Sequence, residues 1–321
     1  MTATATEASE VVIETIDLTK DYEVGFLKKR RVRALDHLNL EVRRGEIFGF
    51  LGPNGAGKTT TLKLLMRLIY PSEGTARILG HPIDDVATRS RIGYLPENPY
   101  FYDYLSGREL LEYTAALFGI PAEQARVRGK ELLDRVGLDS ERANRQLRKY
   151  SKGMLQRIGI AQALINDPEI VFMDEPMSGL DPIGRREIRD LLLSLRAQGK
   201  TVFFSSHILS DVEAMCDRAA ILSRGTLLRS GTVHELTGIE DSALEVVALG
   251  VDPSALARFP QILPSLQSVA ATPNGLHLVL GNESELDETL ALIHECGGKL
   301  VSVNPRRASL EDVFAGTEET P

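Results

Sequence analysis

The stretch of sequence that decides the fold is Gly52-Pro53-Asn54-Gly55-Ala56-Gly57-Lys58-Thr59-Thr60. It follows an apolar run, residues 47–51, and leads into residues 62–69, whose apolar side chains recur at helical spacing. The order of strand, glycine loop and helix fits the phosphate-binding pattern G-x-x-x-x-G-K-[ST]. Glycines let successive backbone N–H groups turn inward around an anion, and the start of a helix adds unpaired N–H groups. The stretch therefore predicts a nucleoside-triphosphate site.

Two side chains of this stretch have predicted roles. The ammonium group of Lys58 should reach the β- and γ-phosphates, and the hydroxyl of Thr59 should bind Mg²⁺. The alternative is a glycine turn that precedes a lysine by chance, and the flanking strand and helix argue against it. The chemistry predicted here is therefore that of a magnesium–nucleotide complex.

The composition limits the class of protein. The chain has 321 residues, of which 43% are hydrophobic and 26% charged, and its net charge is −8. These values are typical of a soluble globular protein of about two domains, and the negative charge argues against a general nucleic-acid binder. No window approaches the roughly 20 apolar residues that span a bilayer, so we expect any membrane role to act through a partner. Residues 1–10 lack the pattern of a signal peptide and are expected to form a disordered tail.

Two acidic residues in tandem, Asp174 and Glu175, follow the apolar strand predicted for residues 170–173. Ligands of open α/β sheets bind at the carboxyl ends of the strands, and buried carboxylates need a partner or a metal. His207 occupies the same position after the strand predicted for residues 201–204. Alone it would be read as a structural histidine, but together with the other loops it is a candidate for contact with the γ-phosphate.

Two of three further features leave alternatives open, namely Tyr22 and the basic run 28–33. Tyr22 is either a core aromatic or a side chain that stacks on a purine ring, and Ser151 is expected to cap the helix that follows it. The basic run 28–33 is interpreted as a solvated hairpin tip, with contact to anionic lipid or an acidic partner as the alternative.

Residues 237–321 are expected to form a separate unit. Strand patterns at residues 244–249, 266–271, 276–280 and 300–303 alternate with two helical segments, and Pro273-Asn274-Gly275 has the composition of a hairpin turn. The resulting order βαββαβ predicts a ferredoxin-like domain. It contains no catalytic constellation, so its role is either dimer contact or regulation, or that of a folded spacer.

Residues 11–236 resemble the nucleotide-binding subunit of an ATP-binding-cassette (ABC) transporter, which implies a P-loop NTPase cassette with a helical subdomain. The resemblance rests on motifs in the order that the family has: Walker A at 52–59, Q-loop at Glu97, signature at 150–154, Walker B at 170–174, catalytic Glu175, D-loop at 178–181 and switch His207.

The resemblance implies a role for each of these residues. Glu175 would orient and deprotonate the attacking water, His207 would hold the γ-phosphate, and Asp174 would share Mg²⁺ with Thr59. Tyr22 would stack on adenine, with Phe26 as a rival. The residues from Gly52 to Thr60 would surround the phosphates.

The signature and the D-loop point to a second subunit. Ser151 and Gly153 would contact an ATP held by the partner's Walker loop, and Asp181 would belong to the same composite site. The implied assembly is a head-to-tail dimer, of two copies or of this chain and a homologue, with two ATP molecules between the subunits.

Two motifs depart from the family pattern. The Q-loop carries Glu97 where glutamine is usual, so its carboxylate offers oxygen to Mg²⁺ or water and adds negative charge near the phosphates. The signature reads Tyr150-Ser151-Lys152-Gly153-Met154 instead of L-S-G-G-Q, a variant similar to the branch that serves ABC-2-type permeases, which are often exporters.

The predicted function is an ATPase that requires ATP and Mg²⁺ and powers an ABC-2-type permease, for export, from the cytoplasmic side of the cell membrane. The main alternative is a soluble member of the superfamily that acts in translation or DNA repair. A small-molecule kinase would need neither the signature nor the tandem acids, and a non-hydrolysing module would not need Lys58, Asp174, Glu175 and His207.

Overall fold

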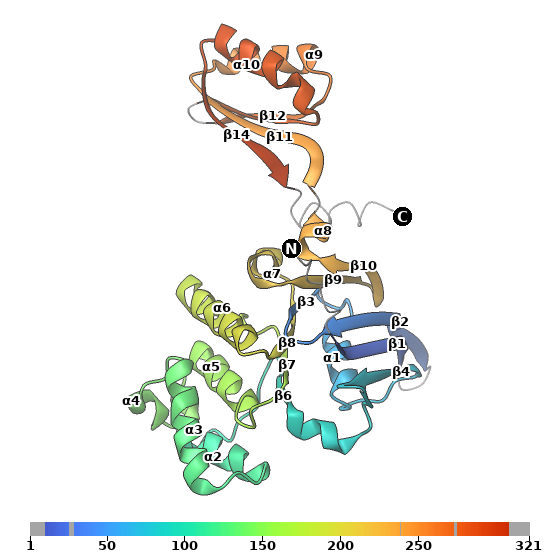
Figure 1. Cartoon of the computed structure of the whole chain (residues 1–321), viewed down its shortest axis with the longest axis vertical. Helices are drawn as coiled ribbons and strands as arrows, with labels where there is room; N and C mark the ends of the chain where they lie inside the picture. The colour runs from blue at the N-terminus through green and yellow to red at the C-terminus, as the bar shows by residue number, and fades with distance from the viewer. Residues whose placement is uncertain (1–9, 26–28, 238, 273–274, 308–321) are drawn as a thin grey trace, which may run out of the picture. The chain divides into compact units, whose positions relative to one another are not determined.

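The computed structural model describes residues 10–25, 29–237, 239–272 and 275–307 (Figure 1). Outside these ranges lie residues 1–9 of the expected N-terminal tail, Phe26, residues 273–274 of the expected hairpin turn and residues 308–321 at the end of the expected second unit. The chain divides into two compact units, Met1–Val233 and His234–Pro321. No helix in the described ranges is long and apolar enough to cross a membrane.

A six-stranded sheet forms the centre of the first unit. Its strand order is β10-β9-β3-β8-β7-β6, and all neighbours are parallel except β10 and β9. Every residue of β3, β7 and β8 is buried, as expected of parallel strands covered on both faces. The strands are β3 (Ile47–Leu51), β6 (Ile92–Leu95), β7 (Ile170–Asp174), β8 (Thr201–Ser206), β9 (Arg218–Ser223) and β10 (Thr226–Thr232).

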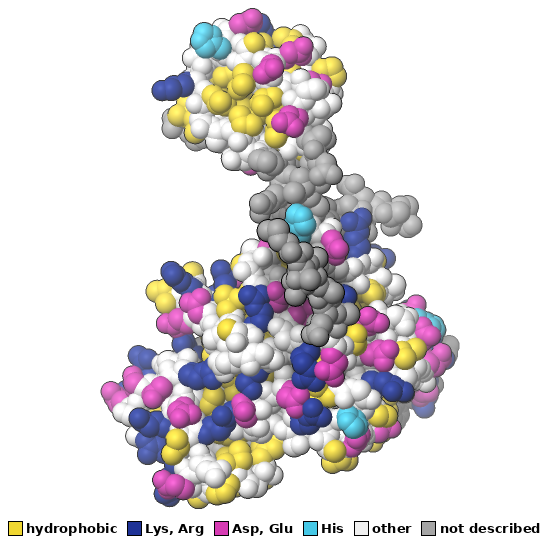
Figure 2. Space-filling model, in the orientation of Figure 1, with side chains coloured by type: hydrophobic (Ala, Val, Ile, Leu, Met, Phe, Trp, Pro, Cys, Tyr) yellow, Lys and Arg dark blue, Asp and Glu magenta, His cyan; other side chains and the backbone are white. Residues whose placement is uncertain are grey.

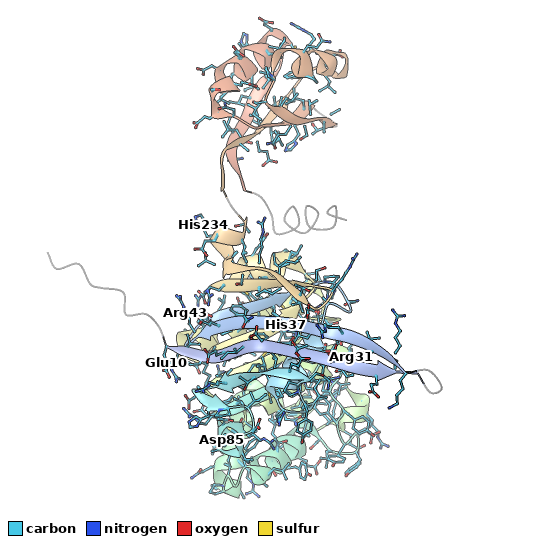
Figure 3. All side chains as sticks on the ribbon, turned by 90° about the vertical axis from the view of Figure 1, so that its right-hand side faces the viewer. Glu10, Arg31, His37, Arg43, Asp85 and His234 are labelled. Atoms are coloured by element: carbon cyan, nitrogen blue, oxygen red, sulfur yellow. The ribbon has the colours of Figure 1, made fainter. Side chains whose placement is uncertain are left out.

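A second, antiparallel sheet of this unit has the order β2-β1-β4-β5, with β1 (Val11–Val24), β2 (Arg30–Arg43), β4 (Glu73–Ile78) and β5 (His81–Pro82). Figure 3 shows β1 and β2 as a long ribbon, with Glu10 and Arg43 at one end and Arg31 toward the other. The basic run predicted at a hairpin tip begins β2 from Arg30 onward. It can extend the ladder because Asp21 of β1 forms ion pairs with Arg31 and Arg33.

Helix α1 (Lys58–Leu65) lies between the two sheets (Figure 1). The ring of Phe203 contacts those of Phe48, Phe50 and Phe172, with centroids 5.5, 5.4 and 5.7 Å apart. Aromatic pairs of this kind each contribute about 0.5–1.5 kcal/mol beyond their buried area. This cluster joins β3, β7 and β8 near their middle, so it fixes the separations of these three strands.

The remaining α-helices of this unit lie on the other side of the central sheet, and those between residues 107 and 163 form a helical subdomain, as Figure 1 shows. Residues 118–121 separate α2 from α3, and Ser106 and Glu109 form a capping box at the start of α2. The elements are the 3-10 helices η1 (Val86–Arg91) and η2 (Leu147–Lys149), and α2 (Gly107–Leu117), α3 (Ala122–Arg135), α4 (Ser140–Ala143), α5 (Lys152–Ala163), α6 (Pro182–Ala197) and α7 (Leu209–Met215).

The second unit has the predicted order βαββαβ. Its antiparallel sheet has the order β12-β13-β11-β14, which is that of a ferredoxin-like domain, so this prediction is confirmed. Phe259, Leu292 and Ile293 pack on Val246 and Leu278 of the sheet. The elements are β11 (Ile239–Leu249), η3 (Pro253–Arg258), α9 (Phe259–Ile262), β12 (Leu266–Thr272), β13 (Gly275–Leu280), η4 (Glu283–Glu285), α10 (Leu286–Glu295) and β14 (Lys299–Arg307), preceded by α8 (Val233–Thr237).

Candidate active site

A cavity of about 460 Å³ lies at the carboxyl end of the central sheet. It brings together residues from segments far apart in the sequence, including ten of the residues predicted for the site. The lining residues are Ala34, Asn54, Gly55, Ala56, Gly57, Lys58, Thr59, Thr60, Glu97, Glu175, Ser178 and His207.

The glycine loop connects β3 to the start of α1. Gly57 is the N-cap of α1 and has φ +108°, a backbone conformation that favours glycine. A Cβ atom at this position would stand 2.6 Å from the carbonyl oxygen of Ala34, so the site also lacks space for one. Gly57 has no side chain that could accept a hydrogen bond from the first N–H groups of the helix. These N–H groups therefore remain available to bind an anion.

The ammonium group of Lys58 is buried inside this loop, with 6% of the residue exposed. Its Nζ donates a hydrogen bond of 2.7 Å to the carbonyl oxygen of Gly52 and lies 3.6 Å from Oε1 of Glu175. A buried cation held by neutral carbonyls and one carboxylate can bind a more negative group such as a phosphate.

The carboxylate of Asp174, at the end of β7, is 1% exposed. Its Oδ1 accepts a hydrogen bond of 2.6 Å from the hydroxyl of Ser205, whereas Oδ2 is buried without a partner among the described residues. A buried carboxylate oxygen without a donor is unfavourable in a folded protein, so its placement fits a cation that binds there.

Glu175 has φ +52°, which costs a residue with a Cβ about 1–3 kcal/mol. Its backbone N–H donates to Ser205 Oγ at 3.0 Å, and its carbonyl oxygen accepts from the N–H of Ser178 at 3.0 Å. The turned backbone directs the carboxylate into the cavity. Oε2 lies 2.9 Å from Nδ1 of His207, and Oε1 faces Lys58.

Seven of the predicted residues do not line the cavity: Tyr22, Gly52, Pro53, Ser151, Gly153, Asp174 and Asp181. Tyr22 lies on β1 with 37% of its surface exposed, and Nζ of Lys20 is 5.2 Å from its ring centroid. Gly52 and Pro53 take part through their carbonyl oxygens, which accept from Lys58.

Ser151 and Asp181 occupy the starts of two helices. Ser151 caps α5, as predicted, by accepting from the N–H of Met154, and Asp181 caps α6 by accepting from the N–H of Gly184 at 2.8 Å. The two segments pack together, because a Cβ at Gly153 would lie 3.3 Å from the side chain of Leu180. The two capped helix starts thus lie next to each other, and neither Ser151 nor Asp181 belongs to the lining of the cavity.

Three residues at the site were not predicted as site residues. Ala34 and Ser178 line the cavity, and Ser205 bonds to both acidic residues. Ser205 could have been found from its place at the end of an apolar strand two residues before His207. Ala34 carries no such signal, because its position depends on the packing of β2 against the glycine loop.

Tyr94 of β6 has a phenol group whose ionisation is disfavoured by its surroundings at this end of the sheet. Burial, and to a smaller extent the charge of Asp174, raise the pKa of its phenol to about 12. Tyr94 therefore stays protonated at neutral pH and is excluded as a general base. Within the described ranges, no three or more His, Cys, Asp or Glu side chains gather as a metal cage.

Comparison with known proteins identifies the relatives of the chain. A family model described as ABC transporter matches residues 35–178. An ABC transporter ATP-binding protein of Synechocystis sp. is 48% identical over 304 residues, which cover 94% of this chain and 83% of that protein. The bacitracin transport ATP-binding protein BcrA of Bacillus licheniformis is 43% identical and covers 68% of each chain. The dimeric, post-hydrolysis structure of the cassette MJ0796 with ADP and Pi has a TM-score of 0.64 at 28% identity, over 69% of this chain and 99% of that one.

Proposed function

Because the chain belongs to the family of ABC transporter ATP-binding proteins, which bind and hydrolyse ATP, we propose that it powers an ABC-2-type membrane permease that exports its substrate. The observation that carries this proposal is the meeting of Lys58, Glu175 and His207 in one cavity beside the glycine loop. Because this family consists of transporter subunits, the alternative of a soluble ATPase in translation or DNA repair is excluded.

Export is supported by the names of relatives. A Nod factor export ATP-binding protein of Cupriavidus metallidurans is 36% identical over 90% of this chain and 95% of that protein. A daunorubicin resistance ATP-binding protein of Streptomyces coeruleorubidus is 34% identical over 88% of this chain and 90% of that protein.

We assign residues 11–236 to the cassette and residues 237–321 to an accessory domain. The protein would act at the cytoplasmic face of the membrane, bound to the permease and to no nucleic acid. We expect no nucleic-acid partner because charges of both signs are interspersed on the visible face of the first unit (Figure 2).

Each side chain has a role in the proposed reaction. Lys58 exchanges its contacts with Gly52 and Glu175 for the phosphates and, with the loop N–H groups, neutralises charge on the transferring phosphoryl group. Glu175 orients the attacking water and accepts its proton, and His207 holds the γ-phosphate. Its Nδ1 contacts Glu175, which leaves Nε2 for the phosphate.

The residues at the site fit Mg²⁺. Thr59 and Asp174 supply the hard oxygen ligands that this ion prefers, and Glu97 on the cavity wall offers another. Since Mg²⁺ in such sites is usually shared between one or two carboxylates and the substrate phosphates, a protein cage is not required. When bound, the ion neutralises negative charge on the phosphates.

The exposed helix starts at Ser151 and Asp181 support a dimer. In the proposed arrangement Ser151, Gly153 and Asp181 complete the site of a second subunit, and Tyr22 stacks on the adenine. The dimeric structures of the MJ0796 cassette support this assembly, whether of two copies or of homologues.

The decisive test of the base is Glu175→Gln. The amide cannot accept the proton of water, so we expect turnover to stop while an ATP-stabilised dimer remains. Phosphate release measures the first and size-exclusion chromatography with ATP the second. Glu123→Gln, a change of an exposed glutamate in α3, is the matched control. Near-normal hydrolysis by Glu175→Gln would remove this residue as the base.

Mixing two inactive variants tests the dimer. Lys58→Ala and Ser151→Ala should each be inactive, because each lacks one half of both composite sites. A mixed head-to-tail dimer retains one intact site, so an equimolar mixture should recover about a quarter of the wild-type ATPase rate. If Ser151 serves the Walker loop of its own chain, the mixture stays inactive.

A further inference from the structure

Ser205 lies between the two acidic residues because of the register of the sheet. Strands β7 and β8 are parallel neighbours, and Asp174 is paired with Ser205 at their carboxyl ends. Ser205 is fully buried, in a strand whose other residues are also buried. A buried hydroxyl needs hydrogen-bond partners, and the only polar groups that the chain places beside this one, among the contacts described for it, belong to Asp174 and Glu175.

The hydroxyl has one proton to donate and lone pairs to accept with. The proton is directed to Oδ1 of Asp174 at 2.6 Å, and the oxygen accepts the N–H of Glu175 at 3.0 Å. The directions of the bonds are fixed, because a carboxylate can only accept and a backbone N–H can only donate. A single side chain therefore contacts the carboxylate of one acid and the backbone of the next.

Each bond has a consequence for the site. The bond to Asp174 occupies Oδ1 and leaves the buried Oδ2 as the oxygen with no partner among the described residues. The bond to Glu175 holds a backbone with φ +52°, whose unfavourable conformation places the side chain beside His207 and Lys58.

We propose that Ser205 is a positioning residue that sets, through one hydroxyl, which oxygen of Asp174 meets the metal and where Glu175 meets the water. The proposal rests on the roles assigned above to Asp174 and Glu175. It explains why a serine ends a strand that is otherwise apolar from Val202 to Phe204.

Ser205→Ala removes both bonds and adds no atoms. Outer partners of metal ligands typically change metal affinity or activity 10- to 100-fold, so we expect kcat to fall roughly 10-fold or more with the KM for ATP little changed. The affinity for Mn²⁺, measured by electron paramagnetic resonance with a non-hydrolysable ATP analogue, should fall by a similar factor.

Two further variants separate hydrogen bonding from packing. Ser205→Cys fills the space but is a weak donor and acceptor, so it should be impaired like Ser205→Ala. Thr201→Val changes the other end of β8, where the hydroxyl accepts from the N–H of Gly45 at 2.9 Å, and should leave kcat and Mn²⁺ affinity unchanged. Recovery of wild-type values in Ser205→Cys would mean that packing alone matters, and would overturn the proposal.

The same measurements separate this proposal from the proposed function. Wild-type kcat and Mn²⁺ affinity in Ser205→Ala, with Asp174→Asn and Glu175→Gln inactive, would overturn the role of Ser205 alone. Normal hydrolysis by Asp174→Asn and Glu175→Gln would overturn the assigned roles, whereas the Mn²⁺ affinity of Ser205→Ala would still decide whether its hydroxyl supports a metal site.

Discussion

The carboxylates at the two ends of strand β7 differ in their hydrogen-bond partners. Before its first residue, Glu169 accepts two hydrogen bonds from Arg91, at 2.5 and 3.0 Å, and one from Arg44 at 2.9 Å. At the other end, Asp174, the last residue of the strand, keeps a buried oxygen with no partner in the described part of the chain, and the next residue, Glu175, has an unfavourable backbone conformation. The carboxylate at the amino end has its hydrogen-bond partners within the protein, whereas the buried oxygen at the carboxyl end would gain a partner only from a ligand. The comparison distinguishes carboxylates that stabilise the fold from those that serve the reaction.

The largest effect is expected at the carboxyl end, from Lys58→Ala. Loss of the ammonium group removes the cation that faces the phosphates, and removal of one such donor typically costs roughly 10²–10³ in kcat. Steady-state ATPase assays measure this change. Lys63→Ala, in the exposed part of the same helix, is the matched control. A loss of only a few-fold in Lys58→Ala would contradict the comparison.

A smaller effect is expected from Gly57→Ala, which tests the loop itself. The added Cβ meets the carbonyl oxygen of Ala34 in a backbone conformation with φ +108°, so we expect unfolding to become easier by about 1–3 kcal/mol. Gly55 also has positive φ but has no atom within 4 Å of a built Cβ, so Gly55→Ala isolates the strain, about 1 kcal/mol. Urea denaturation measures both. Equal losses in the two variants would mean that the contact with Ala34 has no effect.

The smallest effect is expected at the amino end, from Glu169→Gln. Hydrogen bonds from Arg91 lower the pKa of this carboxyl below its ordinary value of 4.5, so its ionised form stabilises the folded state above pH 4.5. That stabilisation disappears as the pH falls through the lower, folded-state pKa. Because the group is partly exposed, the loss at neutral pH should be at most about 1 kcal/mol.

Urea denaturation of wild type and Glu169→Gln at several pH values checks this linkage. The two proteins should differ at pH 7 and converge in acid, with the ATPase rate unchanged at pH 7. A difference that persists in strong acid would mean that shape, and not charge, is responsible.

Much of the cassette could be predicted because its motifs and strand patterns each consist of residues close together in the sequence. The glycine loop, the apolar strands and the acids at their ends follow from residues adjacent in the chain. The helix start at Ser151 was also predictable, since an N-cap depends on a few neighbouring residues. The basic run before Arg33 was less predictable, because its extension into β2 depends on pairing with Asp21 of β1.

The opposite roles of the two ends of β7 could not be read from the sequence. Glu169, Asp174 and Glu175 are all acids at the limits of one apolar strand. What distinguishes them is that Arg44 and Arg91, from distant segments of the chain, contact the carboxylate at one end, whereas Ser205 and Lys58 contact those at the other.

Local residue patterns predict the order of elements, the phosphate loop and the kinds of side chain at the strand ends, because backbone preference and hydrophobic periodicity act over a few residues. Packing between distant segments brings Lys58, Glu175 and His207 into one cavity and leaves Ser151 and Asp181 outside it. The same packing places the hydroxyl of Ser205 in contact with both acids. Such contacts depend on the register between strands that lie about 30 residues apart, and no local pattern encodes that register.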